Sequence, residues 1–387
     1  MTAATMAAVI AATTTAAISA MKSTKMTTTT MATITKSTKS TRSTKRKSMM
    51  TTEVNAVAPW QWWEHRFTAM NTTVEVQVYG RNPTQPLAVE QLFREAEQRM
   101  SRFLSDSELS RFNATGDQPV TLSPELFDAL EAALAAAWAT DGLFDPTLLD
   151  DLVAAGYDRS FEHVVERAQF RWSAPVDLHD APQVTRRRLF SYADIQLDRA
   201  GRRATKPAAL RLDLGGMGKG WTVDRAAELL LGEGPFLVNA GGDLYAHGQP
   251  GDRRGWEITI EHPWRPEQWI ARLFLDHMAL ATSTIMKRRW RRNGALHHHL
   301  IDPRSGRPAN TDAASVTVVA PRTLLAEVFA KVALVLGAEA GIAFLEQTPD
   351  IDGLIYTTDG RLLHTTGLRD RIDALAPTGQ SDAETSQ

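Results

Sequence analysis

The sharpest local signal in the sequence is the stretch Asp213-Leu214-Gly215-Gly216-Met217-Gly218-Lys219-Gly220. Apolar residues precede it, and residues 221–230 have the spacing of a helix. Glycines let the backbone approach a ligand closely, a helix N-terminus presents free N–H groups, and lysine adds a mobile cation. The spacing matches neither the phosphate loop of nucleotide triphosphatases nor the dinucleotide fingerprint. The stretch therefore indicates either a site for a phosphate ester or an ordinary strand-to-helix turn.

A second glycine pair follows a short predicted strand, in Asn239-Ala240-Gly241-Gly242-Asp243. One interpretation is a β-turn in which Asp243 caps nearby amides. The other is a second loop of the same site. Two loops of this kind in one chain favour a shared polyphosphate site over two unrelated turns.

The surrounding pattern mixes strands and helices without regular βαβ spacing, so it predicts an α+β fold and not a doubly wound parallel sheet. Alternating apolar residues, or short apolar runs, predict strands at 72–79, 191–197, 211–214, 236–239, 256–261, 271–275 and 315–319. Helical spacing and capping residues predict helices at 88–103, 124–140, 221–230 and 324–336.

Composition excludes several classes of protein. None of the 387 residues is a cysteine, which rules out disulfides, thiolate catalysis, cysteinyl zinc sites and a lipidated cysteine anchor. Residues 1–52 hold eight Lys or Arg and no acid, so the rest of the chain has 35 basic and 45 acidic residues. An acidic body argues against a nucleic-acid partner, because phosphate binding needs a basic face.

Domain boundaries follow from the same composition. Residues 1–53 are low-complexity Thr, Ala, Ser, Lys and Met, so we expect them to be disordered. A single folded domain is expected over 59–376, with a disordered tail over 377–387. We expect no transmembrane segment and see no convincing secretion signal. The compartment stays open between cytoplasmic and exported.

Three consecutive histidines, His297-His298-His299, precede an Asp-Pro turn. Adjacent residues of a strand point to opposite faces, so only two of the three could share a face, and a zinc site would lack a third ligand. His299 could serve as a proton-transfer group, or it could be an ordinary hydrogen-bonded histidine.

Taken in order, these pieces resemble the ApbE family of FAD:protein FMN transferases over about residues 70–337. The blocks that carry the resemblance are Met70-Asn71-Thr72, Ser101-Arg102-Phe103, Ser107 to Asn113, Gly142-Leu143-Phe144-Asp145-Pro146-Thr147, the Asp213 stretch, Asn239 to Asp243, Ala281-Thr282-Ser283 and His299 to Gly306.

The resemblance implies a single large α+β domain of the ApbE type, related to the T-fold. It implies an enzyme that binds FAD with Mg²⁺, cleaves the pyrophosphate, and attaches FMN to a Thr or Ser hydroxyl of an acceptor protein with release of AMP. It implies that Gly216 faces the metal through its carbonyl. The residues implied to contact FAD are Met70, Phe103, Leu143, Phe144, Asp145, Asp213, Lys219 and Ile301.

The chain departs from the family at the expected metal ligands. The family usually has Asp and Thr where this chain has Glu327 and Lys331. Lys331 could pair with Glu327 and leave the metal site damaged, or it could take the place of the metal as a catalytic point charge that neutralises the pyrophosphate directly. It could also swing away, so that Mg²⁺ binds through Glu327, water and backbone. The alternative function is therefore an impaired FAD-binding protein or an FAD pyrophosphatase. Smaller departures are Asn71, Gly218 and Thr284-Ile285.

Overall fold

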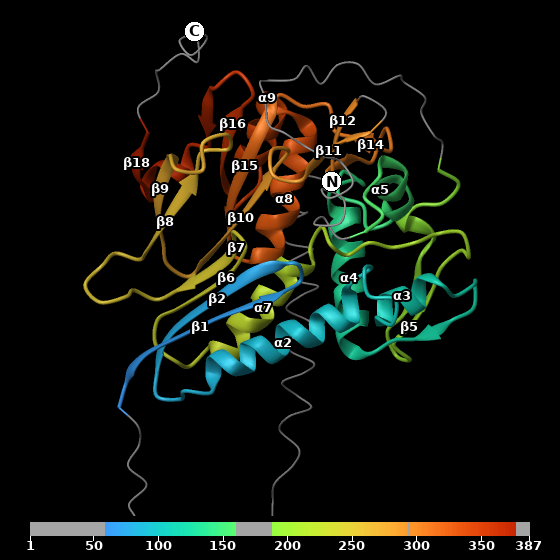
Figure 1. Ribbon diagram of the computed structural model, residues 1–387, viewed down its shortest axis with the longest axis horizontal. Helices are drawn as coiled ribbons and strands as arrows, with labels where there is room; N and C mark the ends of the chain where they lie inside the picture. Colours follow the sequence, from blue (N-terminus) through green and yellow to red (C-terminus); the bar gives the residue numbers. More distant parts are fainter. Residues whose placement is uncertain (1–58, 160–187, 293–294, 377–387) are drawn as a thin grey trace, which may run out of the picture.

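The computed structural model describes residues 59–159, 188–292 and 295–376 (Figure 1). The predictions made for residues 1–53 and 377–387 lie outside these ranges. The described chain has an α+β fold built on one large sheet, as predicted. No helix in this part of the chain is long and apolar enough to cross a lipid bilayer.

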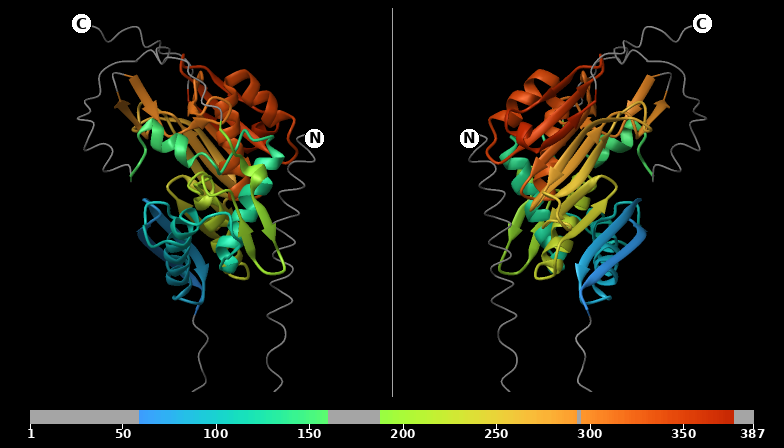
Figure 2. Two further views of the ribbon diagram at one scale, coloured as in Figure 1. Left: turned by 90° about the vertical axis from the view of Figure 1, so that its right-hand side faces the viewer. Right: turned by 90° about the vertical axis from the view of Figure 1, so that its left-hand side faces the viewer.

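The large sheet has eight strands in the order β1-β2-β6-β7-β10-β15-β16-β17, and every neighbouring pair is antiparallel. Figure 2 shows the N-terminal hairpin, in blue, and the C-terminal strands, in red, at opposite ends of this strand order. The strands are β1 (Gln61–Ala69), β2 (Thr72–Gly80), β6 (Phe236–Ala240), β7 (Asp243–His247), β10 (Met278–Thr284), β15 (Ala313–Ala320), β16 (Asp352–Thr357) and β17 (Leu362–His364).

Both faces of the sheet are covered near β15, because every residue of this strand is buried. Val316 and Val318 pack in a cluster with α8, whereas Val319 packs in a second cluster with β8 and β9. Alternate residues of a strand point to opposite faces, so helices cover one face and a small sheet covers the other. The elements that cover the sheet are α2 (Gln85–Met100), α7 (Gly218–Leu230), α8 (Thr323–Leu336), α9 (Ala338–Glu346), β8 (Trp256–Glu261), β9 (Trp269–Leu275) and β18 (Ile372–Leu375).

A helical subregion packs beside the large sheet around α4 (Pro124–Ala139), which begins as predicted: Leu126 donates its N–H to the Ser123 hydroxyl. The other elements of this subregion are α3 (Glu108–Asn113), α5 (Leu149–Ala155), β3 (Val120–Thr121), β4 (Gln196–Asp198), β5 (Arg203–Thr205), β11 (Arg289–Arg292), β12 (Ala295–His298), β13 (Ile301–Asp302), β14 (Arg307–Pro308) and the 3₁₀ turn η1 (Tyr192–Asp194). The 3₁₀ turn η2 (Gly367–Arg371) packs instead against β9 and β16.

One predicted strand is wrong, and a second is shorter than predicted. Residues 211–214 form no strand, although Leu212 and Leu214 are buried, because the backbone of Leu212 pairs with the side-chain amide of Asn113 on both its N–H and its carbonyl, each at 2.8 Å. Residues 191–197 begin as η1, because Ser191 forms a capping box with Asp194; only β4 remains as a strand. The other predicted strands and helices are present within a few residues of the expected bounds.

Candidate active site

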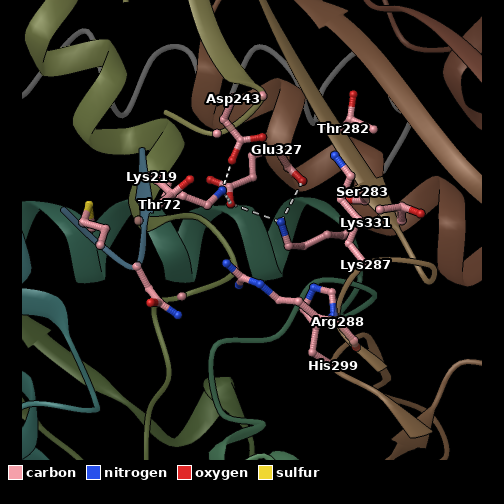
Figure 3. Close-up of a pocket in the computed structure, with 18 of the residues that line it drawn as sticks. Thr72, Lys219, Asp243, Thr282, Ser283, Lys287, Arg288, His299, Glu327 and Lys331 are labelled. Carbon is pink, nitrogen blue, oxygen red and sulfur yellow. Dashed lines mark hydrogen bonds and ion pairs between the residues drawn. The ribbon is translucent and has the colours of Figure 1, made fainter. Parts of the chain in front are cut away.

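A cavity of about 1250 Å³ lies beside the turns that connect β1 to β2 and β6 to β7. The large sheet, α7, α8 and the helical subregion surround it. It brings together all the residues proposed from the sequence, which come from segments far apart in the chain: Met70, Phe103, Leu143, Phe144, Asp145, Asp213, Gly216, Lys219, His299, Ile301, Glu327 and Lys331. Their convergence makes this cavity the candidate active site (Figure 3).

Two tight turns form one side of the cavity. Met70 and Asn71 both have positive φ, 50° and 58°, and connect β1 to β2 as a two-residue hairpin turn. The turn from β6 to β7 lies beside it, because β2 pairs with β6, and a Cβ on Gly241 would lie 2.0 Å from the Thr72 hydroxyl oxygen. Glycine is therefore required at Gly241, and the two turns expose their backbone to the cavity together.

The glycine stretch lies opposite these turns. Asp213 accepts the N–H of Gly215 at 2.8 Å and lies 3.4 Å from the guanidinium of Arg102, so its carboxylate holds the loop in place. The loop enters α7 at Gly218. A Cβ on Gly220 would lie 2.7 Å from the carbonyl oxygen of Thr323, so this glycine allows α7 to pack directly against α8.

Four charged side chains form a lysine–carboxylate corner where α7, β7 and α8 meet: Lys219, Asp243, Glu327 and Lys331. Lys219 Nζ pairs with the Asp243 carboxylate and lies 3.1 Å from Glu327 Oε1. Lys331 Nζ lies 3.2 Å from that same oxygen, and Gly220 donates its N–H to Glu327 Oε2 at 2.8 Å. Figure 3 shows these side chains meeting at the cavity wall.

Burial strengthens the electrostatic interactions among the charged side chains of the corner. The side chain of Glu327 is 2% exposed, whereas those of Lys219 and Lys331 are 18% and 19% exposed and reach the cavity. Burial alone would raise the pKa of Glu327, but Lys219, Lys331 and the Gly220 N–H outweigh it and lower this pKa to about 2. Burial lowers the pKa of Lys219, and the nearby Lys331 and Arg288 lower it further against the effect of Glu327. Glu327 is thus ionised throughout the physiological pH range.

The cavity also has an apolar wall, which consists of Phe103, Leu143, Phe144 and Ile301. Phe144 begins this wall beside the corner, because a Cβ on Gly216 would lie 3.3 Å from its ring and 3.6 Å from Lys331 Cε. Phe144 and Ile301 are buried, while Phe103 is 38% exposed. The guanidinium of Arg102 lies over the Phe103 ring, 4.1 Å from its centroid, and holds the ring at the cavity edge. This wall offers flat apolar surface of the kind that binds an aromatic ring.

Asp145 lines the cavity, but protein groups already bind its carboxylate. Thr147 donates its N–H at 2.8 Å and its hydroxyl at 2.6 Å to Oδ1, and Arg188 donates to Oδ2 at 2.7 Å. Arg188 also donates to the carbonyl of Pro303 at 2.8 Å, so Asp145 joins three segments of the wall. Its predicted contact with the ligand stays a prediction.

The three histidines separate as strand alternation requires. His298 is buried, lies 3.0 Å from the carbonyl oxygen of Ala309, and has a pKa that burial lowers to about 4. His299 lines the cavity, with Nδ1 3.4 Å from the carbonyl oxygen of Arg288. Burial, with Arg288, His298 and Lys331 nearby, lowers the pKa of His299 well below 6.5. Since a carbonyl only accepts, the tautomer that fits this contact has its hydrogen on Nδ1 and leaves Nε2 as an acceptor.

Comparison with known proteins decides the family. The sequence profile of the ApbE family matches residues 70–355. This chain belongs to the ApbE family. It is 31% identical over 332 residues to the FAD:protein FMN transferase of Treponema pallidum, covering 79% of this chain and 87% of the relative. It is 26% identical to a protein of the same name from Klebsiella pneumoniae, over 79% of this chain and 92% of that relative.

Solved structures of ApbE proteins share the fold of the chain. The Thermotoga maritima ApbE protein matches with a TM-score of 0.68 at 24% identity, covering 80% of this chain and 99% of that one. The flavin transferase ApbE from Vibrio cholerae matches with a TM-score of 0.64 at 24% identity, covering 81% and 100%.

The residues of this ApbE-family chain do not fit the Mg²⁺ that the family implies. Mg²⁺ needs a near-octahedral set of oxygen ligands, but both oxygens of Glu327 already accept N–H groups and Lys331 offers no oxygen. A Cβ on Gly216 would lie 3.6 Å from Lys331 Cε, so this side chain fills the space between Gly216 and Glu327. Within the described ranges, no three His, Asp or Glu side chains are grouped to hold a metal ion.

Two cations that line the cavity, Lys287 and Arg288, were not predicted from the sequence. Arg288 lies after β10 and lines the cavity, and Figure 3 shows its side chain extending toward the lysine–carboxylate corner. It forms no ion pair with any carboxylate in the part of the chain that the structure describes. Its only signal is the run Lys287-Arg288-Arg289, which is equally typical of a solvated loop.

Proposed function

We propose that this chain is an FAD:protein FMN transferase, which cleaves the pyrophosphate of FAD and attaches FMN through a phosphoester to a Thr or Ser hydroxyl of an acceptor protein, releasing AMP. One observation carries the proposal: residues implied by the family to contact FAD come from distant segments and line one cavity. Membership of the ApbE family, whose curated relatives bear this name, supports it.

The cavity suits a dinucleotide in size and chemistry. Pockets for small ligands usually measure about 300–1,000 Å³, and this one measures about 1250 Å³. The apolar wall supplies surface for an aromatic ring. The glycine stretch, Lys219, Lys331 and Arg288 supply amide and cationic groups for phosphate oxygens. Binding FAD across the cavity would place its pyrophosphate at the lysine–carboxylate corner.

The transfer step requires little covalent chemistry from the protein. A bond forms between the acceptor hydroxyl oxygen and the FMN phosphorus, while the bond from that phosphorus to the bridging oxygen breaks and AMP leaves with the electron pair. The hydroxyl proton passes to solvent, to the leaving phosphate, or to Nε2 of the neutral His299. Phosphoryl transfer depends chiefly on positioning and on positive charge beside the phosphate oxygens. In this cavity Lys219, Lys331 and Arg288 supply that positive charge.

The proposal is tested by incubating the purified protein with FAD and candidate acceptor proteins from the source organism. We expect AMP release and a fluorescent flavin that stays on the acceptor in a denaturing gel. Lys219→Met should abolish the label, whereas Arg361→Gln, on the protein surface, should not change it. FAD that binds but is neither cleaved nor transferred to any acceptor would reject the proposal.

A further inference from the structure

The side chain of Lys331 lies where the family places a metal. Its aliphatic part passes the backbone of Gly216, and its Nζ lies 3.2 Å from Glu327 Oε1 and 3.4 Å from the Glu327 carbonyl oxygen. The position between Gly216 and Glu327 is therefore occupied by an ammonium group of the chain itself. From this we infer that Lys331 supplies the positive charge at the FAD pyrophosphate, so that this transferase cleaves FAD without a divalent cation. The inference rests on the proposed function.

The hydrogen bonds of Glu327 explain why a metal cannot be added beside the lysine. Oε1 accepts from Lys219 and Lys331, and Oε2 accepts from the N–H of Gly220. A divalent ion bound to either oxygen would displace one of these donors and lie next to two ammonium groups. A buried carboxylate that is already paired with two cations has neither the charge nor the free oxygen for Mg²⁺.

The charges in the corner and immediately beside it support the same conclusion. Lys219 and Lys331 balance Asp243 and Glu327, so the corner alone is neutral. Arg288 adds a positive charge that no described carboxylate pairs with, and both lysines reach the cavity. Bound pyrophosphate thus meets Lys331 directly and Arg288 from the side. When the bridging oxygen leaves with AMP, Lys331 can follow the developing charge as a point charge on a flexible stem.

The experiment removes or rebuilds the lysine and varies the metal. Lys331→Met keeps the stem and removes the charge, and Glu327→Asp with Lys331→Thr restores the family's two oxygen ligands. In excess EDTA the unmodified enzyme should keep its rate of AMP release from FAD within about twofold of its rate in Mg²⁺. Lys331→Met should lose about 10- to 100-fold in both conditions, the size of a lost charge-assisted hydrogen bond. The double variant should lose its activity in EDTA and regain it in Mg²⁺.

Binding measurements test the inference without any turnover. Titration of Mn²⁺ in the presence of AMP, followed by electron paramagnetic resonance, should detect no bound ion in the unmodified protein and a bound ion in the double variant. FAD affinity, followed by flavin fluorescence, should be the same in EDTA and in Mg²⁺. Tight Mn²⁺ binding by the unmodified protein, or an EDTA-induced loss of activity that Mg²⁺ reverses, would overturn the inference. FAD that binds but is never cleaved in any condition would instead reject the proposed function, and the Mn²⁺ titration would still decide about the lysine.

Discussion

The two sides of the cavity relate differently to the ApbE family. The residues of the apolar wall, Phe103, Leu143, Phe144 and Ile301, line one cavity, and their contact with FAD stays a prediction. The lysine–carboxylate corner lies where the metal was expected, but the ammonium group of Lys331 stands in place of an oxygen ligand, and Glu327 is already paired with both lysines. If the proposals hold, the apolar surface and the source of positive charge have changed independently of each other within one fold.

The two sides also differ in how their residues depend on one another. Each residue of the apolar wall lines the cavity with its own side chain, so the loss of one should leave the others in place. Corner residues share one carboxylate: Lys219, Lys331 and the Gly220 N–H all bind Glu327. The loss of Glu327 leaves two cations without their partner, so we expect large coupled effects in the corner and small additive effects at the wall.

Glu327→Gln should have the largest effect. Removing one member of a buried ion pair costs about 3–5 kcal/mol because the remaining charge is buried without compensation. We expect a loss of this size in the free energy of unfolding, measured with urea. The control is Glu339→Gln, an exposed carboxylate paired with Arg361, which should cost less than about 1 kcal/mol. Equal losses in the two variants would contradict the coupled description of the corner.

The free energy of unfolding in acid should depend on the buried histidines and not on the corner. The pKa of Glu327 is about 2, so the corner stays charged well below neutral pH. His298 has a pKa of about 4 in the fold and about 6.5 when unfolded, so the unfolded state binds more protons between these values. Its contribution to stability is complete above pH 6.5 and is lost as the pH falls toward 4, in total about 3 kcal/mol at 1.36 kcal/mol per pKa unit.

The measurement for this prediction is the free energy of unfolding between pH 7 and 4. His298→Gln should lower stability at pH 7 but flatten its dependence on pH. A variant with the same slope as the unmodified protein would assign the acid loss to other groups, His299 among them.

Local pattern was enough for much of the fold and failed where long-range bonds decide. The alternation at residues 72–79 correctly predicted β2, since one face of that strand is buried. The same kind of pattern at 211–214 gave a wrong strand, because the amide of Asn113, far away in sequence, takes the place of a neighbouring strand. No spacing rule contains that bond.

In the site, too, local patterns predicted some of the contacts, and long-range contacts decided the others. The order of motifs led to the residues that line the cavity, and the i to i+4 spacing allowed a Lys331–Glu327 pair to be expected. That Lys219 shares the same oxygen, and that Asp145 is held by Arg188, depends on contacts 108 and 43 residues apart. Arg288 was missed because a short basic run has no feature that separates a site from a solvated loop.

Gly220→Ala should perturb the corner by an intermediate amount. The added Cβ would lie 2.7 Å from the Thr323 carbonyl oxygen and 2.9 Å from Glu327 Oε2, so α7 must shift away from α8. Such overpacking costs about 1–3 kcal/mol. Gly116→Ala is the matched control, because its Cβ would meet nothing within 4 Å, and it should leave the urea midpoint nearly unchanged. If both variants behave alike, the close approach of the two helices does not limit stability.

Phe103→Ala should have the smallest effect on the protein and a specific effect on the ligand. The ring is 38% exposed, so stability should change little, while the loss of an aromatic contact should weaken FAD binding by about tenfold. Leu231→Ala, at an apolar residue that is 57% exposed and does not line the cavity, should leave the affinity unchanged. The affinity is measured by quenching of flavin fluorescence.

The sharpest form of the test combines Phe103→Ala with Lys331→Met. If the wall and the corner act separately, the effects of the two substitutions on the free energy of FAD binding should add to within about 0.5 kcal/mol. A larger coupling energy would mean that the ring and the ammonium group act on one shared position of the flavin nucleotide.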